Sequence, residues 1–374
     1  MLDGFGVYLH VPFCLSKCPY CDFCSFPGSS EEDRERYVKA VLREIKERDF
    51  PRRSATSVFF GGGTPSLLDA RQFDALLSAV SKRHPIAPDA EITFEMNPAT
   101  ADREKLNSLR SLGFNRVSIG CQSLSDEELS ALGRAHTAEG FFRAYEDALA
   151  AGFTNINIDL MYGIPRQTED SFAKTLETVA SLSPTHVSAY GLIVEEGTPF
   201  YRRRDSLGLP GDDVEADLYA MASRTLRSAG YAHYEISNYA RPGGYECRHN
   251  LLYWRQGEYA AYGLSASSHI GGVRETNTRD LLAYLSDPAN AVAEKTVIEG
   301  GDAEYEYIML ALRLTEGIGE TDFGLRFGRS FRETYAEKLA PYYERGLLQN
   351  EGDRTALSDE GLYLCSALLR DLLP

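Results

Sequence analysis

The residues best suited to chemistry are four cysteines in the stretch FCLSKCPYCDFC: Cys14, Cys18, Cys21 and Cys24. The first three have the spacing C-x3-C-x2-C. Three thiolates on one short loop can bind three irons of a [4Fe–4S] cluster, which leaves one iron open to a small chelating molecule. Zinc is the alternative, although zinc ligands usually come in pairs from two separate loops. The spacing therefore favours an iron–sulfur cluster.

A second set of residues follows the apolar part of several strand-like runs. It consists of Gly61 to Gly63 with Thr64, Glu95 and Asn97, Gln122, Asp159, and Glu195 with Glu196. Any one of these alone is most often a loop glycine or a solvated side chain. Because the strands of a parallel barrel all end at one face, residues at these positions meet in one mouth. The sequence predicts that this mouth is the functional site.

The strands that would position these residues are six runs of β-forming residues: 6–13, 56–63, 90–98, 114–123, 156–165 and 186–194. Stretches with helical periodicity separate them. In the longest, 29–50, Ser30 stands at the N-cap position, and Gly113 stands where a C-cap glycine belongs after another. Strands that alternate with helices predict a parallel sheet with right-handed crossovers. The fold class is therefore α/β, a partial (β/α)6 barrel.

The rest of the chain has a different pattern. Residues 196–300 combine a polar connector, a helix and a stretch rich in aromatic and turn residues, which predicts an α+β region. From residue 301 to 374 the pattern is mainly helical and ends as strand, turn, strand and helix, like a winged-helix module. The predicted domains are therefore 1–195, 196–300 and 301–374.

The composition limits the kinds of function. The 374 residues carry a net charge of −16, which disfavours binding to nucleic-acid phosphates. The chain lacks an apolar run of about 18 residues that would span a membrane. Its start, MLDGFGVYLHVPFC, lacks the basic and apolar regions of a secretion signal. We therefore expect a cytoplasmic protein whose thiols stay reduced.

The cysteine motif follows the first predicted strand and has an aromatic residue, Tyr20, directly before its third cysteine. In this it resembles the radical S-adenosylmethionine (SAM) superfamily, whose members chelate SAM at the open iron. The stretch FFGGGTPS (59–66) resembles the glycine motif of that superfamily. Glycines let the backbone approach a ligand closely. The resemblance implies that Cys14, Cys18 and Cys21 hold a [4Fe–4S] cluster and that SAM is a cofactor.

Further stretches narrow the resemblance to two related families, oxygen-independent coproporphyrinogen III oxidase and the heme chaperone HemW. These stretches are YLHVPFC, FGGGTPS, FEMNP, VSIGCQS, LGRAH, NIDLMYGIP and SAYGLIVEEGTPFY, which together extend over much of the chain. The residues that the resemblance implies as SAM contacts are Tyr8, Tyr20, Gly62, Gly63, Thr64, Glu95, Gln122, Arg134 and Asp159.

Three features separate the two families, and two of them lie near the cysteine motif. The oxidase has a long N-terminal arm before its cluster motif, whereas thirteen residues precede Cys14 here. The fourth cysteine of the oxidase stands two residues after the third, and that position is Phe23 in this chain. Chaperone sequences usually have an asparagine there, so Cys24 matches neither family. We expect Cys24 to be a small, partly buried side chain, with a redox or spare-ligand role as the less favoured alternative.

Residues 249–254 read HNLLYW and resemble the HNxxYW motif of the chaperone family, which is proposed there to serve heme binding. The resemblance makes His249, Asn250, Tyr253 and Trp254 the heme-binding candidates. An imidazole is a common axial ligand of heme iron, and Tyr253 and Trp254 offer flat faces to a porphyrin. The residues alone also allow another interpretation, in which His249 is an ordinary hydrogen-bonded histidine and Trp254 a core anchor.

Neighbouring residues add to these candidates. Arg248 is placed to pair with a heme propionate. His233 and Cys247 are rival iron ligands.

The sequence thus predicts a heme chaperone that carries one [4Fe–4S] cluster with exchangeable SAM and transfers heme to an acceptor hemoprotein. The alternative is the oxidase, an enzyme that decarboxylates coproporphyrinogen III oxidatively with the cluster and SAM. A structural zinc protein is a third hypothesis. As partners we expect heme and the acceptor, but no nucleic acid and no transmembrane segment. A peripheral membrane contact is compatible with this prediction, as is either a monomer or a homodimer.

Overall fold

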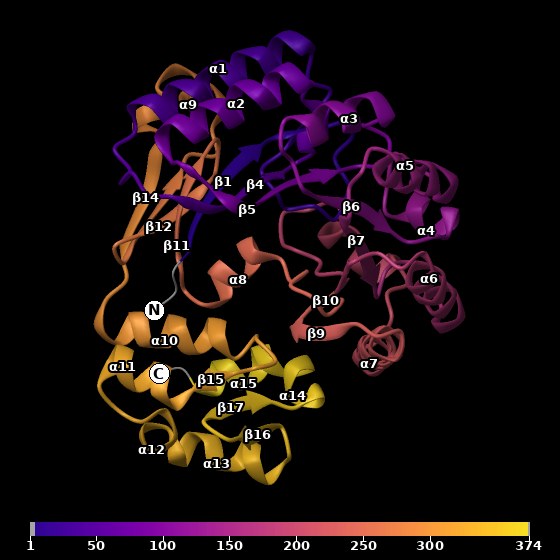
Figure 1. The fold of residues 1–374 in the computed structure, drawn as a ribbon. Coiled ribbons are helices and arrows are strands. Elements are labelled where there is room, and N and C mark those ends of the chain that lie inside the picture. The colour runs from indigo at the N-terminus through magenta and orange to yellow at the C-terminus, as the bar shows by residue number, and fades with distance from the viewer. Residues whose placement is uncertain (1–3, 373–374) are drawn as a thin grey trace.

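The computed structural model describes residues 4–372, and its centre is one twelve-stranded sheet (Figure 1). Six of its strands run parallel and lie side by side in chain order. They are β1 (Phe5–Val11), β4 (Ala55–Gly62), β5 (Ile86–Met96), β6 (Arg116–Gln122), β7 (Asn155–Tyr162) and β8 (His186–Gly191). Each overlaps one predicted run, so the predicted α/β fold with a partial (β/α)6 barrel is confirmed.

Helices that follow the strands cover the convex face of the sheet (Figure 1). They are α1 (Glu31–Glu47), α2 (Ala70–Arg83), α3 (Arg103–Ser111), α4 (Asp126–Ala131), α5 (Ala138–Ala150) and α6 (Glu169–Leu182). Ser30 is the N-cap of α1, because its side chain accepts a hydrogen bond from the Asp33 amide. Gly113 follows α3 with a φ of 103°, a conformation that favours glycine.

The segment after β8 extends both edges of the same sheet. At the β8 edge it adds η2 (Tyr201–Ser206), α7 (Asp212–Ser228), β9 (Ala232–Glu235) and β10 (Asn238–Ala240). At the β1 edge it adds β11 (Glu258–Tyr262), β12 (Ser267–Ile270), β13 (Val273–Asn277) and β14 (Val292–Val297), with α9 (Leu281–Ser286) and η3 (Pro288–Asn290) between the last two. Strand β11 is parallel to β1, and β10 is antiparallel to β8.

One short helix, α8 (Arg248–Trp254), joins these two edge extensions across the open side of the barrel (Figure 1). It contacts β1, β4 and β11. The residues expected to form an α+β region therefore build on the central sheet, which local periodicity does not show because their partner strands are distant in sequence. The division of the chain at residues 195 and 300 stays a prediction.

The C-terminal part of the chain forms a layer below the barrel (Figure 1). Its helices are α10 (Gly300–Ala311), α11 (Glu320–Phe327), α12 (Phe331–Thr334), α13 (Ala336–Glu344), α14 (Asp359–Tyr363) and α15 (Cys365–Leu372). Its strands β15 (Ile318–Gly319), β16 (Leu348–Glu351) and β17 (Arg354–Leu357) form a small sheet with the order β15-β17-β16. Helices followed by a hairpin agree with the winged-helix interpretation in element order.

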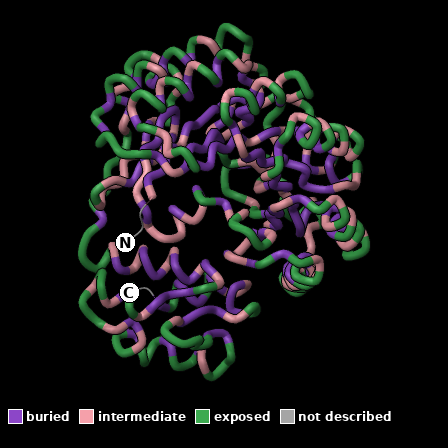
Figure 2. Tube along the Cα trace, in the orientation of Figure 1, coloured by how far each residue is buried: buried purple, intermediate pink, exposed green. Residues whose placement is uncertain are grey.

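The main core lies between the sheet and its outer helices, where the chain is buried in Figure 2. Four phenylalanines, Phe60, Phe73, Phe94 and Phe114, meet there with ring centroids 5.2 to 5.9 Å apart. Such tilted and edge-on contacts stabilise the fold by about 0.5–1.5 kcal/mol per pair beyond the burial of apolar area. This core fixes the strands whose ends carry the candidate site.

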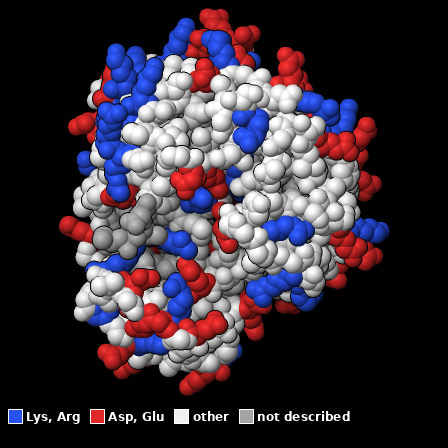
Figure 3. All heavy atoms as spheres, viewed as in Figure 1, with Lys and Arg blue, Asp and Glu red and all other residues white. Residues whose placement is uncertain are grey.

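Charges of both signs are interspersed on the face shown in Figure 3, with basic side chains gathered near α1 and α9. Within residues 4–372, no helix has the length and apolar character that a membrane span requires.

Candidate functional site

A cavity of about 520 Å³ opens at the C-terminal ends of the parallel strands. It gathers all the residues that were predicted to hold the cluster and SAM, except one. The predicted residues that line it are Cys14, Cys18, Cys21, Tyr20, Gly62, Gly63, Thr64, Glu95, Gln122, Arg134 and Asp159. The exception is Tyr8, which faces a second cavity and does not line this one.

The three motif cysteines lie on one wall of this cavity, which we call the cluster cavity. Two short strands, β2 (Phe13–Cys14) and β3 (Phe26–Pro27), pair and bracket the loop that carries them. The Thr64 hydroxyl lies 3.6 Å from the Cys14 sulfur, and an Arg134 nitrogen lies 3.9 Å from the Cys18 sulfur. Burial raises the pKa of the Cys21 thiol. A hydroxyl donor and a cation thus lie beside the sulfurs of Cys14 and Cys18.

The donor set fits an iron–sulfur cluster with an open iron. Three free thiols share the wall, and the buried Arg134 Nε has no hydrogen-bond partner among residues 4–372, so an N–H stays available to a ligand. Over the same range, no group of three or more His, Cys, Asp or Glu side chains could hold a single metal ion. Cys14, Cys18 and Cys21 would be the cluster ligands.

The glycines at the end of β4 allow it to touch the cysteine loop. A Cβ atom on Gly63 would lie 2.7 Å from the Phe13 carbonyl oxygen and 3.1 Å from the Cys14 sulfur. Gly62 has a φ of +118°, and a Cβ there would lie 2.6 Å from the His10 ring. Only glycine fits at these two positions, and the exposed backbone beside Thr64 is free to approach a ligand.

Two half-buried acidic residues, Glu95 and Asp159, line the floor of the cavity and are close enough for their charges to interact. Burial, and then the charge of Asp159, raises the pKa of Glu95 to about 8. The Gly62 amide donates to Glu95 at 3.2 Å, and Ser118 and Asn157 donate to Asp159 at 2.9 and 2.8 Å. Burial raises the pKa of Asp159 as well. A cationic ligand placed here would favour the ionised forms, so this floor suits a positively charged molecule such as SAM.

Gln122 ends β6 in an unusual conformation. Its φ is 69°, in the left-handed region, and the pairing of β6 with β7 shifts register between Gly120 and Gln122. The shift re-aims the side chain into the cavity, where Gln122 accepts a hydrogen bond from the Tyr190 hydroxyl at 2.9 Å. Sequence reasoning missed Tyr190 as a cavity residue, although it stands in the sixth predicted run.

A polar network inside the barrel links the cavity floor to α8. His186 donates from Nδ1 to Asn157 at 2.6 Å, and its Nε2 accepts from the Tyr234 hydroxyl at 2.8 Å. Tyr234 accepts in turn from the amide of Cys247, the N-cap residue of α8. Asn157 donates to Asp159 on the cavity floor, so the chain of bonds is continuous.

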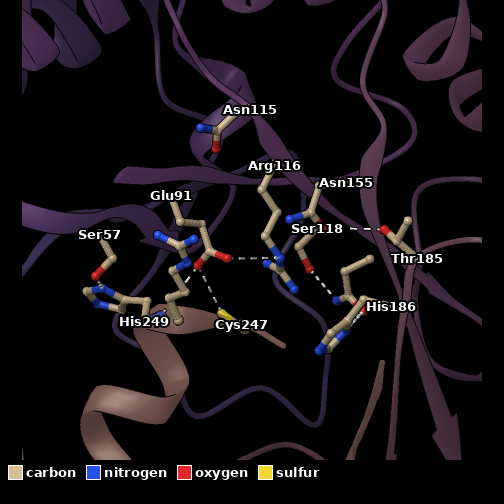
Figure 4. A network of polar contacts seen from close by, with 12 residues as sticks. Ser57, Glu91, Asn115, Arg116, Ser118, Asn155, Thr185, His186, Cys247 and His249 are labelled. Atoms are coloured by element: carbon tan, nitrogen blue, oxygen red, sulfur yellow. Dashed lines mark hydrogen bonds and ion pairs between the residues drawn. The ribbon is translucent and has the colours of Figure 1, made fainter. Parts of the chain in front are cut away.

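A second set of polar contacts holds the N-terminus of α8 against the barrel. The buried Arg116 and Glu91 side chains approach to 3.9 Å, and Glu91 accepts from the Cys247 thiol and the His249 amide (Figure 4). The N-terminus of α8 is thus fixed to the barrel wall.

The four heme-binding candidates do not share one surface. His249 is 1% exposed, and its two ring nitrogens lie 2.8 Å from the Ser57 hydroxyl and 2.9 Å from the Tyr253 hydroxyl. Burial, and then the charge of Arg116, lowers the pKa of His249 to about 3. Asn250 is half-buried, and Trp254 lies under the Arg313 guanidinium at 5.8 Å. In this arrangement His249 offers no free nitrogen to iron.

The other residues proposed around this motif are also engaged. Arg248 pairs with Asp89 at 3.3 Å. His233 stacks on Tyr239 with 4.3 Å between ring centroids, and Cys247 is fully buried. Tyr253 lines the second cavity, which it shares with Tyr8 and Cys24. Cys24 does not line the cavity of the other three cysteines, and its lack of a role in cluster binding stays a prediction.

Comparison with known proteins agrees with this geometry. A model of the radical SAM superfamily matches residues 8–179, and one of the HemN C-terminal domain matches 302–364. The chain is 38% identical to the heme chaperone HemW of Mycobacterium tuberculosis, covering 99% of this chain and 95% of that protein. It is 34% identical to the heme chaperone HemW of Escherichia coli, covering 98% of each.

A solved structure is also similar over its length. Coproporphyrinogen III oxidase (HemN) from Escherichia coli, described as a radical SAM enzyme, superposes with a TM-score of 0.86 at 25% identity, covering 99% of this chain and 90% of that one.

Proposed function

The chain belongs to the heme chaperone HemW family of the radical SAM superfamily, and from this premise we propose that it binds heme and transfers it to an acceptor hemoprotein. The proposal includes one [4Fe–4S] cluster on Cys14, Cys18 and Cys21 with exchangeable SAM beside it. The observation that carries it is the 38% identity to a heme chaperone over 99% of this chain.

The cluster cavity supports the cofactor part of this proposal. A bound [4Fe–4S] cluster supplies an open iron and electrons. The chain supplies the surroundings: Thr64 and Arg134 lie beside the cysteine sulfurs, and the Gly62–Gly63 backbone leaves room for the ligand. Glu95 and Asp159 attract its positive charge. Tyr8 lies outside the cavity, so its predicted SAM contact has less support than the others.

Heme titration tests the proposal. Hemin added to the anaerobically reconstituted protein should produce a saturable Soret band at one heme per chain. The loaded protein should then convert an apo-hemoprotein to its holo form faster than free hemin does. Absence of saturable binding would contradict the chaperone function.

The oxidase stays the second candidate because the cluster cavity holds nearly all the predicted SAM contacts and the whole fold matches HemN. Anaerobic incubation with coproporphyrinogen III, SAM and a reductant tests it. Formation of protoporphyrinogen IX would establish the enzyme, and SAM left intact with no product would exclude it.

We further propose a cytoplasmic location with no nucleic-acid partner, which the net charge of −16 supports. Gel filtration before and after cluster loading would show whether the protein is a monomer or a homodimer.

A further inference from the structure

A second cavity, of about 580 Å³, lies beside the cluster cavity, and the proposed SAM site does not use it. Its volume is within the range of small-molecule sites. Four parts of the chain line it: the cysteine loop through Asp22 to Cys24, strand β1, helix α8, and the sheet extension from β11 to β14. We call it the side cavity.

The walls of the side cavity suit a flat aromatic molecule that carries carboxylates. The Tyr253 and Tyr259 rings meet edge-to-face with centroids 4.6 Å apart, and Tyr8 lies beside them. Phe23, with 66% of its surface exposed, stands on the wall shared with the cluster cavity. The Arg279 guanidinium lies 3.9 Å from the Asp22 carboxylate and is 64% exposed, so its exposed side can pair with a second carboxylate.

We propose that heme occupies the side cavity and not a site on His249, an inference that rests on the proposed function. Tyr253 is the residue of the HNLLYW sequence that reaches this cavity, and His249 lies behind it, hydrogen-bonded to the Tyr253 hydroxyl. His249 is then a positioning residue. The His249 ring holds the Tyr253 side chain in the wall of the side cavity. Both ring nitrogens of His249 are occupied by the hydroxyls of Ser57 and Tyr253.

The contacts within the cavity assign the iron ligand to Cys24. The hydroxyls of Tyr8 and Tyr253 and both nitrogens of His10 already make hydrogen bonds of 2.9 to 3.1 Å. The Cys24 thiol makes only a weak contact, 3.8 Å to the Arg279 carbonyl oxygen. Cys24 therefore loses less than Tyr8, Tyr253 or His10 on turning to iron. The Fe–S bond forms as the thiol proton leaves to solvent, and thiolate is an established heme ligand.

The arrangement also connects heme to the cluster. Asp22 and Phe23 line both cavities and directly follow the cluster ligand Cys21. Arg279 donates to the Asp22 carbonyl oxygen at 3.0 Å and so fastens this loop to the sheet extension. A loop ordered by its cluster therefore forms the wall of the heme site.

Two variants of Thr276 on β13 test the location. Thr276 lines the side cavity and bonds to Ser267 at 2.7 Å. Thr276→Phe fills the cavity and should weaken hemin binding at least tenfold, whereas Thr276→Val, which loses the same hydrogen bond without filling space, should bind as the wild type does. Saturating SAM should not displace heme. Unchanged binding by Thr276→Phe, or competition by SAM, would overturn the location.

Cys24→Ser tests the ligand in the fully reconstituted protein. It should keep the iron and sulfide content of the wild type, but it should shift the Soret band and weaken ferric heme binding at least tenfold. An unshifted Soret band would overturn Cys24 as the ligand. If the wild-type protein does not bind hemin at all, the proposed function fails. If the wild type binds hemin and both Thr276→Phe and Cys24→Ser bind it equally well, only the proposed location and ligand fail.

Discussion

His249 shows how a single residue of a heme-associated sequence can serve the fold. Its imidazole is stacked 5.2 Å from the Phe59 ring and held between two hydroxyls. Burial and the nearby Arg116 keep it neutral, with a pKa of about 3. As a neutral residue with both ring nitrogens hydrogen-bonded, His249 anchors α8 inside the barrel by packing and by these hydrogen bonds.

We therefore predict that His249→Ala destabilises the protein by about 2–4 kcal/mol, because it leaves a cavity and two hydroxyls without their partner. Urea unfolding measures the change. His249→Gln, which can still reach Ser57 and Tyr253, is the matched control and should lose less. An unaltered unfolding midpoint in His249→Ala would mean that the residue is not structural, and a heme-ligand role would regain weight.

Glu95 gives the site a pH dependence. Its pKa in the folded chain is about 8, against a value of 4.5 in an exposed carboxyl. Between these values the folded protein holds a proton that the unfolded chain has released. The stability contribution of Glu95 is therefore present at low pH and is lost as the pH rises through 8.

Glu95→Gln should remove this dependence. Since the amide stays uncharged, we expect the variant, without cluster or SAM, to be several kcal/mol more stable than the wild type above pH 8 and equal to it only below pH 4.5. Thermal unfolding at both pH values measures this. The exposed Glu127→Gln provides the control. The same variant should bind SAM more weakly, because it lacks a carboxylate that can ionise.

At the scale of elements, the end of β4 and the cysteine loop depend on each other. β4 runs parallel between β1 and β5 and ends at Gly62, where its backbone meets the loop that starts from β1. The Gly63 amide donates to the Val11 carbonyl oxygen at 2.8 Å. The position of Cys14 is thus set by the end of the neighbouring strand.

Gly63→Ala should displace this loop, since its Cβ would lie 2.7 Å from the Phe13 carbonyl oxygen. We expect loss of more than half of the iron and sulfide bound on reconstitution, with the overall fold retained by circular dichroism. Gly301→Ala, in α10 with open space around its Cβ, is the control and should keep full cluster content. Normal cluster content in Gly63→Ala would show that the contact is unimportant.

At the scale of the whole molecule, the central sheet unites segments that are far apart in the sequence. The C-terminal layer attaches to it through a bridge between Glu235 and Leu314 and an ion pair of 2.7 Å between Arg227 and Asp359. Trp254 on α8 lies under Arg313 of the same layer. The barrel, α8 and the C-terminal layer therefore support one another.

We predict that the chain unfolds in one transition. Trp254 is the single tryptophan and lies where these parts meet, so its fluorescence reports their separation, while circular dichroism reports the sheet and helices. The two signals should coincide in urea. A tryptophan transition at lower urea would show that the C-terminal layer detaches first.

The sequence by itself determined the barrel and the content of the cluster cavity. Strand runs such as 56–63 and 156–165 are locally encoded, and parallel strands bring their ends together whatever the details of packing. From that rule the sequence predicts that Glu95, Gln122 and Asp159 lie with the cysteines, and all of them line the cluster cavity. The family resemblance supplied their expected roles.

Only the tertiary structure decided where the HNLLYW residues and Cys24 face. The strands from 232 to 297 join both edges of one sheet, and such pairings depend on partners distant in the chain. Helix α8 consequently lies inside the barrel, with His249 buried and Tyr253 on the side cavity. Whether a histidine meets solvent or a hydroxyl depends on what surrounds it, and sequence spacing does not carry that information.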